Sequence, residues 1–185
     1  EFLKSSGIKN QNPLINVCDK HGFVEELVNY LYSHKLNQYI DSYIKTRNPL
    51  KTPSVIGALL DVDASEDYIS GLLMSVGNMC PIEPLVAEVE KRNRLKLLRP
   101  WLEARVNEGT EEPAAHNAIA KIYIDTNNNP DQFLKENQYY DSRVVGKYCE
   151  KRDPHLSFIA YERGQCDEEI VHVTSANSMF KQLAR

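Results

Sequence analysis

Apolar residues in this chain recur at spacings of three and four, in short runs that end near Gly, Asn or Pro. This spacing predicts amphipathic helices with one buried face, because an α-helix turns once in about 3.6 residues. Most runs cover about ten residues, and we expect about a dozen helices joined by short turns. The clearest runs are Val24, Leu27, Val28 and Leu31; Val55, Ile56, Leu59 and Leu60; Ile69, Leu72, Leu73 and Val76; and Ala115, Ala118, Ile119 and Ile122.

Five prolines directly follow a residue that commonly caps helices. The side-chain oxygen of a cap accepts a hydrogen bond from an amide of the first turn, and proline fits that turn because its nitrogen has no hydrogen to donate. We therefore predict capped helix starts at these places. The pairs are Asn12-Pro13, Asn48-Pro49, Thr52-Pro53, Asn129-Pro130 and Asp153-Pro154.

Three segments allow more than one interpretation. Pro100 lies inside an apolar run over residues 95–106, so it must occupy a first turn or kink the helix. The stretches 119–124 and 170–174 alternate partly like strands, but we expect helices in both. The first continues a helical stripe begun by alanines, and the second is flanked by helices and has no evident strand partner. A further helical stub is expected to end at Gly7.

Helices of this length are marginal alone and must bury their apolar faces on neighbours. Short turns make consecutive helices antiparallel, and repeated hairpins then stack side by side. The sequence therefore predicts an all-α fold, a right-handed α-α superhelix of short antiparallel hairpins, as one solenoid segment over residues 1–185. Both ends read as cut from within helices, so we interpret the chain as an excerpt of a longer one.

Composition narrows the classes of partner. The chain of 185 residues is 42% hydrophobic and 26% charged, with a formal net charge of -4, which disfavours nucleic acid as a partner. No apolar run approaches the ~20 residues of a membrane span and the start does not resemble a signal peptide, so direct membrane insertion is not expected. The four cysteines are far apart in sequence and form no C-x-x-C pair, which favours reduced, buried thiols and a cytoplasmic location.

One loop has part of the pattern of a calcium site. Asp125, Asn127, Asn129 and Glu136 match the first, third, fifth and twelfth positions of an EF-hand loop. The sixth position is Pro130, which cannot adopt the positive φ that the tight turn requires. We therefore interpret the segment as a polar turn in which Asn129 caps the next helix.

A zinc site has little support. Cys149, His155, Cys166 and His172 are suitable ligand types, but their spacing matches no compact zinc motif. The helix break at Asp153-Pro154 separates the first two. We predict that these residues pack structurally, and we expect neither a metal nor another cofactor.

No catalytic motif is recognisable in the chain, and we predict that it is not an enzyme. His116 is expected at a helix end or on the surface. The pair Tyr139 and Tyr140, which precedes a capping Asp141, is expected to fix a turn rather than to bind a ligand.

The densest basic run is the candidate interaction site. It contains Lys91, Arg92, Arg94, Lys96 and Arg99, with Glu88, Glu90 and Glu103 nearby. Such a run forms either a solvated helix face or a contact with an acidic surface, for example on another copy of the protein. We select Lys91, Arg92, Arg94 and Lys96 as the possible lattice contact.

Longer stretches resemble the leg of the clathrin heavy-chain family. They include LVAEVEKRNRLKLL at 85–98 with PWLEAR at 100–105, HNA and AKIYID within 116–125, and YYDSRVVGKYCEKRDPHL at 139–156 followed by AYERGQCD at 160–167. Weaker similarity, including LLDVD at 59–63, extends over the chain. The match departs most between Tyr68 and Pro84 and after Asp167.

The resemblance implies a distal leg segment built of clathrin heavy-chain repeats. In that family three heavy chains join as a triskelion, and the legs interweave into the polyhedral coat on the cytoplasmic face of coated pits and vesicles. The implied partners are other heavy chains, whereas light chains and adaptors contact other parts of the full-length protein. The leading hypothesis is a structural scaffold segment in endocytosis and intracellular trafficking; the alternative is a solenoid groove that captures a regulatory peptide or another trafficking protein.

Overall fold

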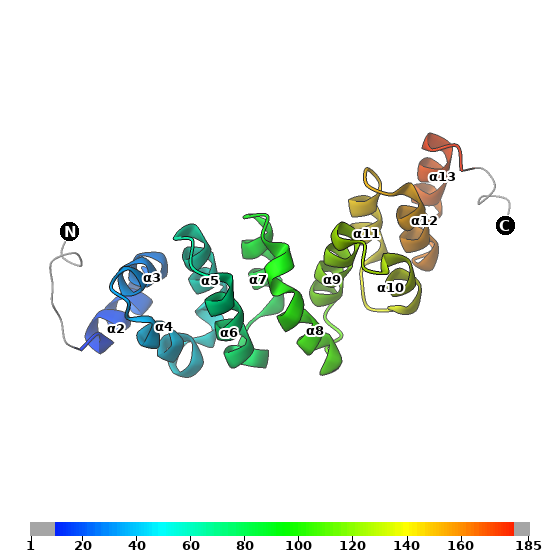
Figure 1. Ribbon diagram of the computed structural model, residues 1–185. Helices are drawn as coiled ribbons and strands as arrows, with labels where there is room; N and C mark the ends of the chain where they lie inside the picture. Colours follow the sequence, from blue (N-terminus) through cyan, green and yellow to red (C-terminus); the bar gives the residue numbers. More distant parts are fainter. Residues whose placement is uncertain (1–9, 180–185) are drawn as a thin grey trace. The chain divides into compact units, whose positions relative to one another are not determined.

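The computed structural model describes residues 10–179, and within them every regular element is a helix (Figure 1). Two compact units divide the chain, 1–101 and 102–185, and the boundary lies within helix α8, Arg99–Asn107. The described part contains twelve α-helices, together with short 3₁₀ and π turns. The predicted all-α solenoid class is therefore confirmed.

In the first unit the α-helices form two layers. Helices α3, α5 and α7 pack in succession in one layer (Figure 1). In the other layer α6 packs between the π turn at Tyr43–Arg47 and the 3₁₀ turn at Leu95–Leu98. Each helix thus covers the apolar stripes of its neighbours. The elements are α2 (Asn12–His21), α3 (Val24–Ser33), α4 (Asn37–Ser42), the π turn (Tyr43–Arg47), a 3₁₀ turn (Pro49–Lys51), α5 (Thr52–Asp61), α6 (Glu66–Val76), a 3₁₀ turn (Gly77–Met79), α7 (Ile82–Glu90) and the 3₁₀ turn Leu95–Leu98.

The second unit has the same kind of sequential packing. Helix α9 packs on α10 and α11, and α12 packs on α10, α11 and α13. The bounds are α9 (Pro113–Thr126), α10 (Pro130–Glu136), α11 (Ser142–Cys149), α12 (Pro154–Arg163) and α13 (Asp167–Ala176). The main core consists of Ala120, Leu134, Tyr140, Val145, Cys149, Leu156, Phe158, Ile159 and Ala160.

Helices α11 and α12 pack closely against each other at Gly146. A Cβ built on Gly146 of α11 would lie 2.6 Å from Cδ1 of Tyr161, and the buried Ser157 hydroxyl donates to the Gly146 carbonyl at 2.9 Å. Only glycine permits this spacing, because any side chain would collide with the ring. The aromatic residue and the missing side chain therefore set the distance between the two helices.

The predicted apolar stripes are confirmed where they were clearest. The runs of Val24 to Leu31 and of Ile69 to Val76 are buried on α3 and α6. Pro100 lies in the first turn of α8, directly after the 3₁₀ turn, which avoids a kink. The stretches 119–124 and 170–174 are helical, as expected, and the stub predicted to end at Gly7 lies outside the described residues.

The proline signal is correct, but the expected capping is mostly wrong. All five prolines occupy first helical turns, yet only Asp153 caps with its side chain, accepting bonds from the amides of His155 and Leu156. Asn129 has a left-handed backbone with φ of 47°, whereas a capping side chain requires an extended one. The Asn48 amide instead donates to Asp19 at 2.9 Å, so a tertiary contact replaces the cap.

The two remaining pairs also lack the predicted side-chain cap. Asn12 is itself the first residue of α2, and Gln11 precedes it at the cap position. Thr52 is likewise the first residue of α5, and its hydroxyl donates to the Pro49 carbonyl at 2.6 Å. In both cases the helix begins one residue earlier than the pair predicts, so the polar side chain is already inside it.

Candidate interaction surface

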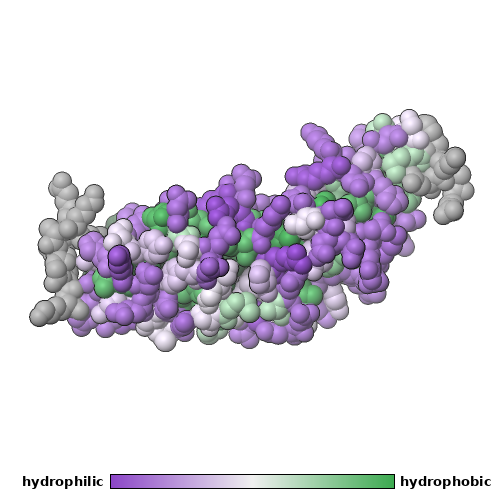
Figure 2. Space-filling view, in the orientation of Figure 1, coloured by the Kyte–Doolittle hydropathy of each residue, from purple (hydrophilic) through white to green (hydrophobic). Residues whose placement is uncertain are grey.

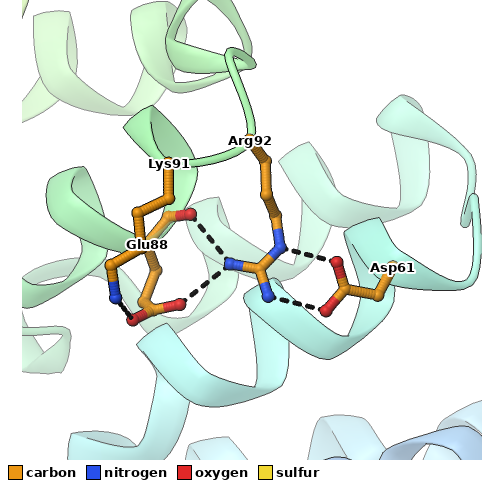
Figure 3. Close-up of polar contacts among 4 residues, drawn as sticks. All are labelled: Asp61, Glu88, Lys91 and Arg92. Carbon is orange, nitrogen blue, oxygen red and sulfur yellow. Dashed lines mark hydrogen bonds and ion pairs between the residues drawn. The ribbon is translucent and has the colours of Figure 1, made fainter.

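The basic run begins where α7 ends, and Arg92 is its most constrained member. Its Nε and Nη2 donate to both carboxylate oxygens of Asp61, at 2.7 and 2.6 Å (Figure 3). Its Nη1 donates to the carboxylate and to the backbone carbonyl of Glu88, at 2.8 and 3.0 Å. The guanidinium therefore joins the C-terminal end of α5 to the last turn of α7.

This position suits a cation for a local reason. Asp61 is the last residue of α5, where the helix dipole disfavours a carboxylate, and the Glu88 carbonyl belongs to the last turn of α7. The positive charge of Arg92 compensates both. Gly57 lies one turn before Asp61, and a Cβ built there would be 3.2 Å from Nη1 and Nη2 of Arg92. The absence of a side chain at Gly57 thus leaves room for the guanidinium.

The ion pairs shift the ionisation of the groups that they join. The hydrogen bond from Arg92 lowers the pKa of Asp61, and bonds from Lys91 and then Arg92 lower the pKa of Glu88. Correspondingly, the bond to Asp61 raises the pKa of Arg92. The cluster is therefore fully charged at neutral pH, and it loses its attraction only when the carboxylates are protonated.

The other cations of the run are more exposed. Lys91 pairs with Glu88 at 2.7 Å, and Arg94 pairs with Glu66 of α6. The side chain of Arg92 is 23% exposed, against 66% for Lys91 and 44% for Arg94. Lys96 is exposed and has no ion pair among residues 10–179. The four predicted site residues are thus divided between an internal brace, Arg92, and a more accessible group.

The second unit contains a cavity of about 420 Å³ that the sequence did not indicate. Its lining includes His116, Asn137 and Tyr139, and the rings of His116 and Tyr139 are 5.0 Å apart. His116 lies near the N-terminus of α9, but its side chain is buried rather than on the surface. A histidine so close to the start of a helix is expected on the surface. Its burial depends on tertiary contacts, which the sequence does not show.

The turn at Tyr139 to Asp141 agrees with the prediction for Tyr140 and Asp141. Asp141 caps α11 by accepting bonds from the amides of Arg143 and Val144, and the buried Tyr140 hydroxyl donates to the Leu134 carbonyl at 2.8 Å. Tyr139 differs, because 45% of it is exposed. Of the two tyrosines, one is part of the core and the other is available at the cavity.

Asp125, the first residue of the calcium-like loop, already has protein partners. The Asp125 carboxylate accepts a bond from the Tyr148 hydroxyl at 2.7 Å and pairs with Arg152 at 3.5 Å. Asn127 and Asn129 have positive φ angles, which fit a tight polar turn. This segment therefore links α9 to α10 and to the end of α11.

Cys149 and Cys166, two residues of the zinc-like set, are buried free thiols. Burial raises the pKa of Cys149 to about 12, so the thiolate that a metal would require is strongly disfavoured. Across residues 10–179 no three His, Cys, Asp or Glu side chains gather closely enough to bind a metal ion. Within the same range, every helix is too short or too polar to cross a bilayer.

Most of the surface facing the viewer in Figure 2 is hydrophilic, with smaller apolar areas between hydrophilic side chains. Exposed large apolar residues occur at separate points of the sequence, such as Val17, Leu50, Met74 and Val171.

Comparison with known families decides the relationship of the chain. The family model described as "Region in Clathrin and VPS" matches residues 73–185, more than half of the chain. The chain belongs to the clathrin heavy-chain repeat family. The resemblance of the stretches at 85–105, 116–125 and 139–167 is thereby confirmed.

Individual clathrin heavy chains match from end to end of this chain. It is 61% identical over 185 residues to the clathrin heavy chain of Dictyostelium discoideum and 61% identical over 184 residues to clathrin heavy chain 2 of Homo sapiens. Clathrin heavy chain 1 of Arabidopsis thaliana is 55% identical over 184 residues. Each match covers 100% of this chain, which spans 11% of the length of each relative.

Proposed function

We propose that this chain is a structural scaffold segment of a clathrin heavy-chain leg, without a catalytic role. The observation that carries the proposal is the 61% identity to a clathrin heavy chain over the whole chain. In this role three heavy chains join as a triskelion, and their legs interweave into the polyhedral coat. The coat lies on the cytoplasmic face of coated pits and vesicles in endocytosis and intracellular transport.

The packing within each unit supports a scaffold role. Each α-helix of the stacks contacts mainly its neighbours, so stability is distributed along the segment rather than concentrated at one site. The partners of the segment are then other heavy chains, and light chains and adaptors bind other parts of the full-length protein. Many weak polar contacts between legs add up to a stable but reversible coat.

A chimera tests the scaffold proposal directly. Residues 1–185 replace the matching segment of the Dictyostelium heavy chain, and purified triskelia are assembled into cages and measured by sedimentation and electron microscopy. We expect cages of normal size and yield. A control chimera carries an unrelated helical solenoid of the same length, and it should form trimers without regular cages. Trimers of the first chimera that cannot form cages would contradict the proposal.

We further propose that the basic run contributes a contact between legs, with its members in different roles. Lys91, Arg94 and Lys96 face an acidic surface of a neighbouring leg, and Arg92 maintains the position of the turn that carries them. Lys96 is the main contributor because it has no ion pair within the described part of the chain.

Charge reversal at Lys96 tests this contact. In the chimera, Lys96→Glu should lower cage yield and shift assembly to a lower salt concentration, because it introduces repulsion at the interface. Lys151→Glu is the matched control, since Lys151 is also exposed and the change in net charge is the same. Equal assembly curves for the two variants would eliminate Lys96 as a contact.

A further inference from the structure

The cavity in the second unit has a rigid wall built on His116. Thr110 accepts a bond from Nε2 of His116 through its carbonyl at 2.8 Å, and the Asn137 side-chain amide donates to Nδ1 at 2.8 Å. The orientation of the Asn137 side chain is fixed, because its oxygen accepts bonds from the backbone amides of Tyr139 and Tyr140. The His116 ring is therefore held by hydrogen bonds at both of its nitrogens.

Tyr139 is held on this wall while much of it stays accessible. Its ring packs against His116, and its backbone amide is bound to Asn137. An aromatic side chain with 45% exposure on such a fixed support presents a preorganised face to a ligand. The sequence suggests only a turn here, and the fold shows that Tyr139 is exposed while Tyr140 beside it is buried.

Two acidic side chains lie at the cavity. Glu136 lines it and accepts a bond from the Gln132 side-chain amide at 3.0 Å, and Glu111 accepts a bond from the Tyr139 hydroxyl at 3.4 Å. Neither carboxylate has an ion pair among the described residues, whereas Glu108 nearby is paired with Arg105 and Lys135 is paired with Asp131. Glu136 is also the last residue of α10, where the helix dipole adds negative potential.

We propose that this cavity, the Tyr139 pocket, binds the side chain of an arginine from an extended segment of a partner protein. The guanidinium stacks on the Tyr139 ring and pairs with the carboxylates of Glu111 and Glu136. Arginine suits the pocket better than lysine, because its planar group can stack on a ring and form parallel bonds to a carboxylate at the same time. This binding role goes beyond the scaffold function and does not depend on it.

The test is a titration of the ¹⁵N-labelled 185-residue chain with the peptide acetyl-Gly-Arg-Gly-amide, followed by NMR. We expect shifts at the amides of Gly109, Thr110, Gln138 and Tyr139, and a dissociation constant on the order of 1 mM, as suits one side chain. Acetyl-Gly-citrulline-Gly-amide has the same shape without the charge and should bind at least about fivefold more weakly. Equal binding of the two peptides, or shifts only at other acidic segments such as 167–169, would overturn the proposal.

Conservative variants identify the groups involved. Glu136→Gln and Glu111→Gln should each weaken binding of the arginine peptide about fivefold, and Tyr139→Leu should do so by removing the aromatic face. Glu168→Gln, an exposed change of the same charge on α13, should have no effect. Unchanged spectra away from the pocket confirm that each variant is folded, and unchanged affinity in all three pocket variants would overturn the proposal.

A second copy of the chain is the competing occupant. Its own arginines could enter the pocket, and sedimentation of the chain without peptide measures this. We expect that the chain does not associate through this pocket, so Tyr139→Leu should leave its sedimentation at every concentration unchanged. Association of that kind would replace the proposed partner segment with another copy, while loss of peptide binding alone would leave the scaffold function intact.

Discussion

Two places in the molecule bring a glycine close to a large side chain, and they differ in what fills the space. Beside Gly57 of α5 lies the guanidinium of Arg92, the end of a long and flexible side chain. Beside Gly146 of α11 lies the ring of Tyr161, a residue buried in the core of the second unit. The first contact is charged and partly solvated, and the second is packed and apolar.

This difference determines how each contact responds to change. A guanidinium can shift by a few tenths of an ångström at little cost, whereas a buried ring can move only with its neighbours. The ion pairs around Arg92 depend on salt and pH, while the packing of Tyr161 depends mainly on shape. We therefore expect the contact between Gly57 and Arg92 to adapt to its surroundings. The contact between Gly146 and Tyr161 should tolerate almost no substitution.

Gly146→Ala should have the largest effect on stability. The added methyl group collides with the Tyr161 ring, and overpacking of this kind costs roughly 3 kcal/mol of the free energy of unfolding. Urea denaturation followed by circular dichroism measures the loss. Gly71→Ala is the matched control, because apart from the adjacent backbone of α6 and the neighbouring residues no atom lies within 4 Å of the added carbon. That variant should gain about 0.5–1 kcal/mol from helix propensity, and a similar gain at Gly146 would refute the packing argument.

The contrast between the glycines shows how far sequence reasoning extends. The apolar spacing was sufficient to locate α3 and α6, since their buried residues follow the helical period closely. It could not distinguish Gly57, Gly71 and Gly146, because each lies within a helical run and the atoms opposite come from other elements. Local signals predict elements, whereas the space beside a glycine depends on tertiary contacts.

The candidate site was predictable only in part for the same reason. The sequence places Lys91, Arg92, Arg94 and Lys96 together and notes acidic neighbours such as Glu88. The partner that holds Arg92 most firmly is Asp61, 31 residues earlier, and nothing in the local pattern indicates it. Long-range ion pairs of this kind arise from the stacking of hairpins and become visible only in the fold.

Arg92→Met should destabilise the first unit by about 1–1.5 kcal/mol, because it keeps much of the side-chain volume but leaves Asp61 and Glu88 without their shared cation. The loss should shrink in 0.5 M NaCl, since Asp61 is largely exposed and its pairing is screened. Arg94→Met is the control for an exposed pair and should cost less than about 0.5 kcal/mol. Equal losses in the two variants would mean that the bridge between α5 and α7 stabilises the fold no more than an exposed ion pair does.

Acid should remove the same stabilisation in the parent chain. The folded pKa values of Asp61 and Glu88 are lowered from their ordinary values of 3.8 and 4.5. Their contribution is therefore fully present above those values and is lost as the pH falls through the lower, folded ones. The difference in unfolding free energy between the parent and Arg92→Met should be constant from pH 6 to 8 and should narrow below about pH 4. A difference that stays constant down to pH 3 would contradict the assignment of the shifts to Arg92.

Gly57→Ala should give the smallest effect, and its sign depends on Arg92. In the parent chain the gain in helix propensity is offset by the displacement of the guanidinium from 3.2 Å, so the net change should be within about 0.5 kcal/mol of zero. In the Arg92→Met background the flexible thioether can yield, and the same substitution should stabilise the chain by about 0.5–1 kcal/mol. The difference between the two backgrounds, measured as a double-mutant cycle, isolates the contact of Gly57 with the guanidinium. A coupling of zero would mean that this glycine is not kept small for Arg92, and the contrast with Gly146 would then rest on Tyr161 alone.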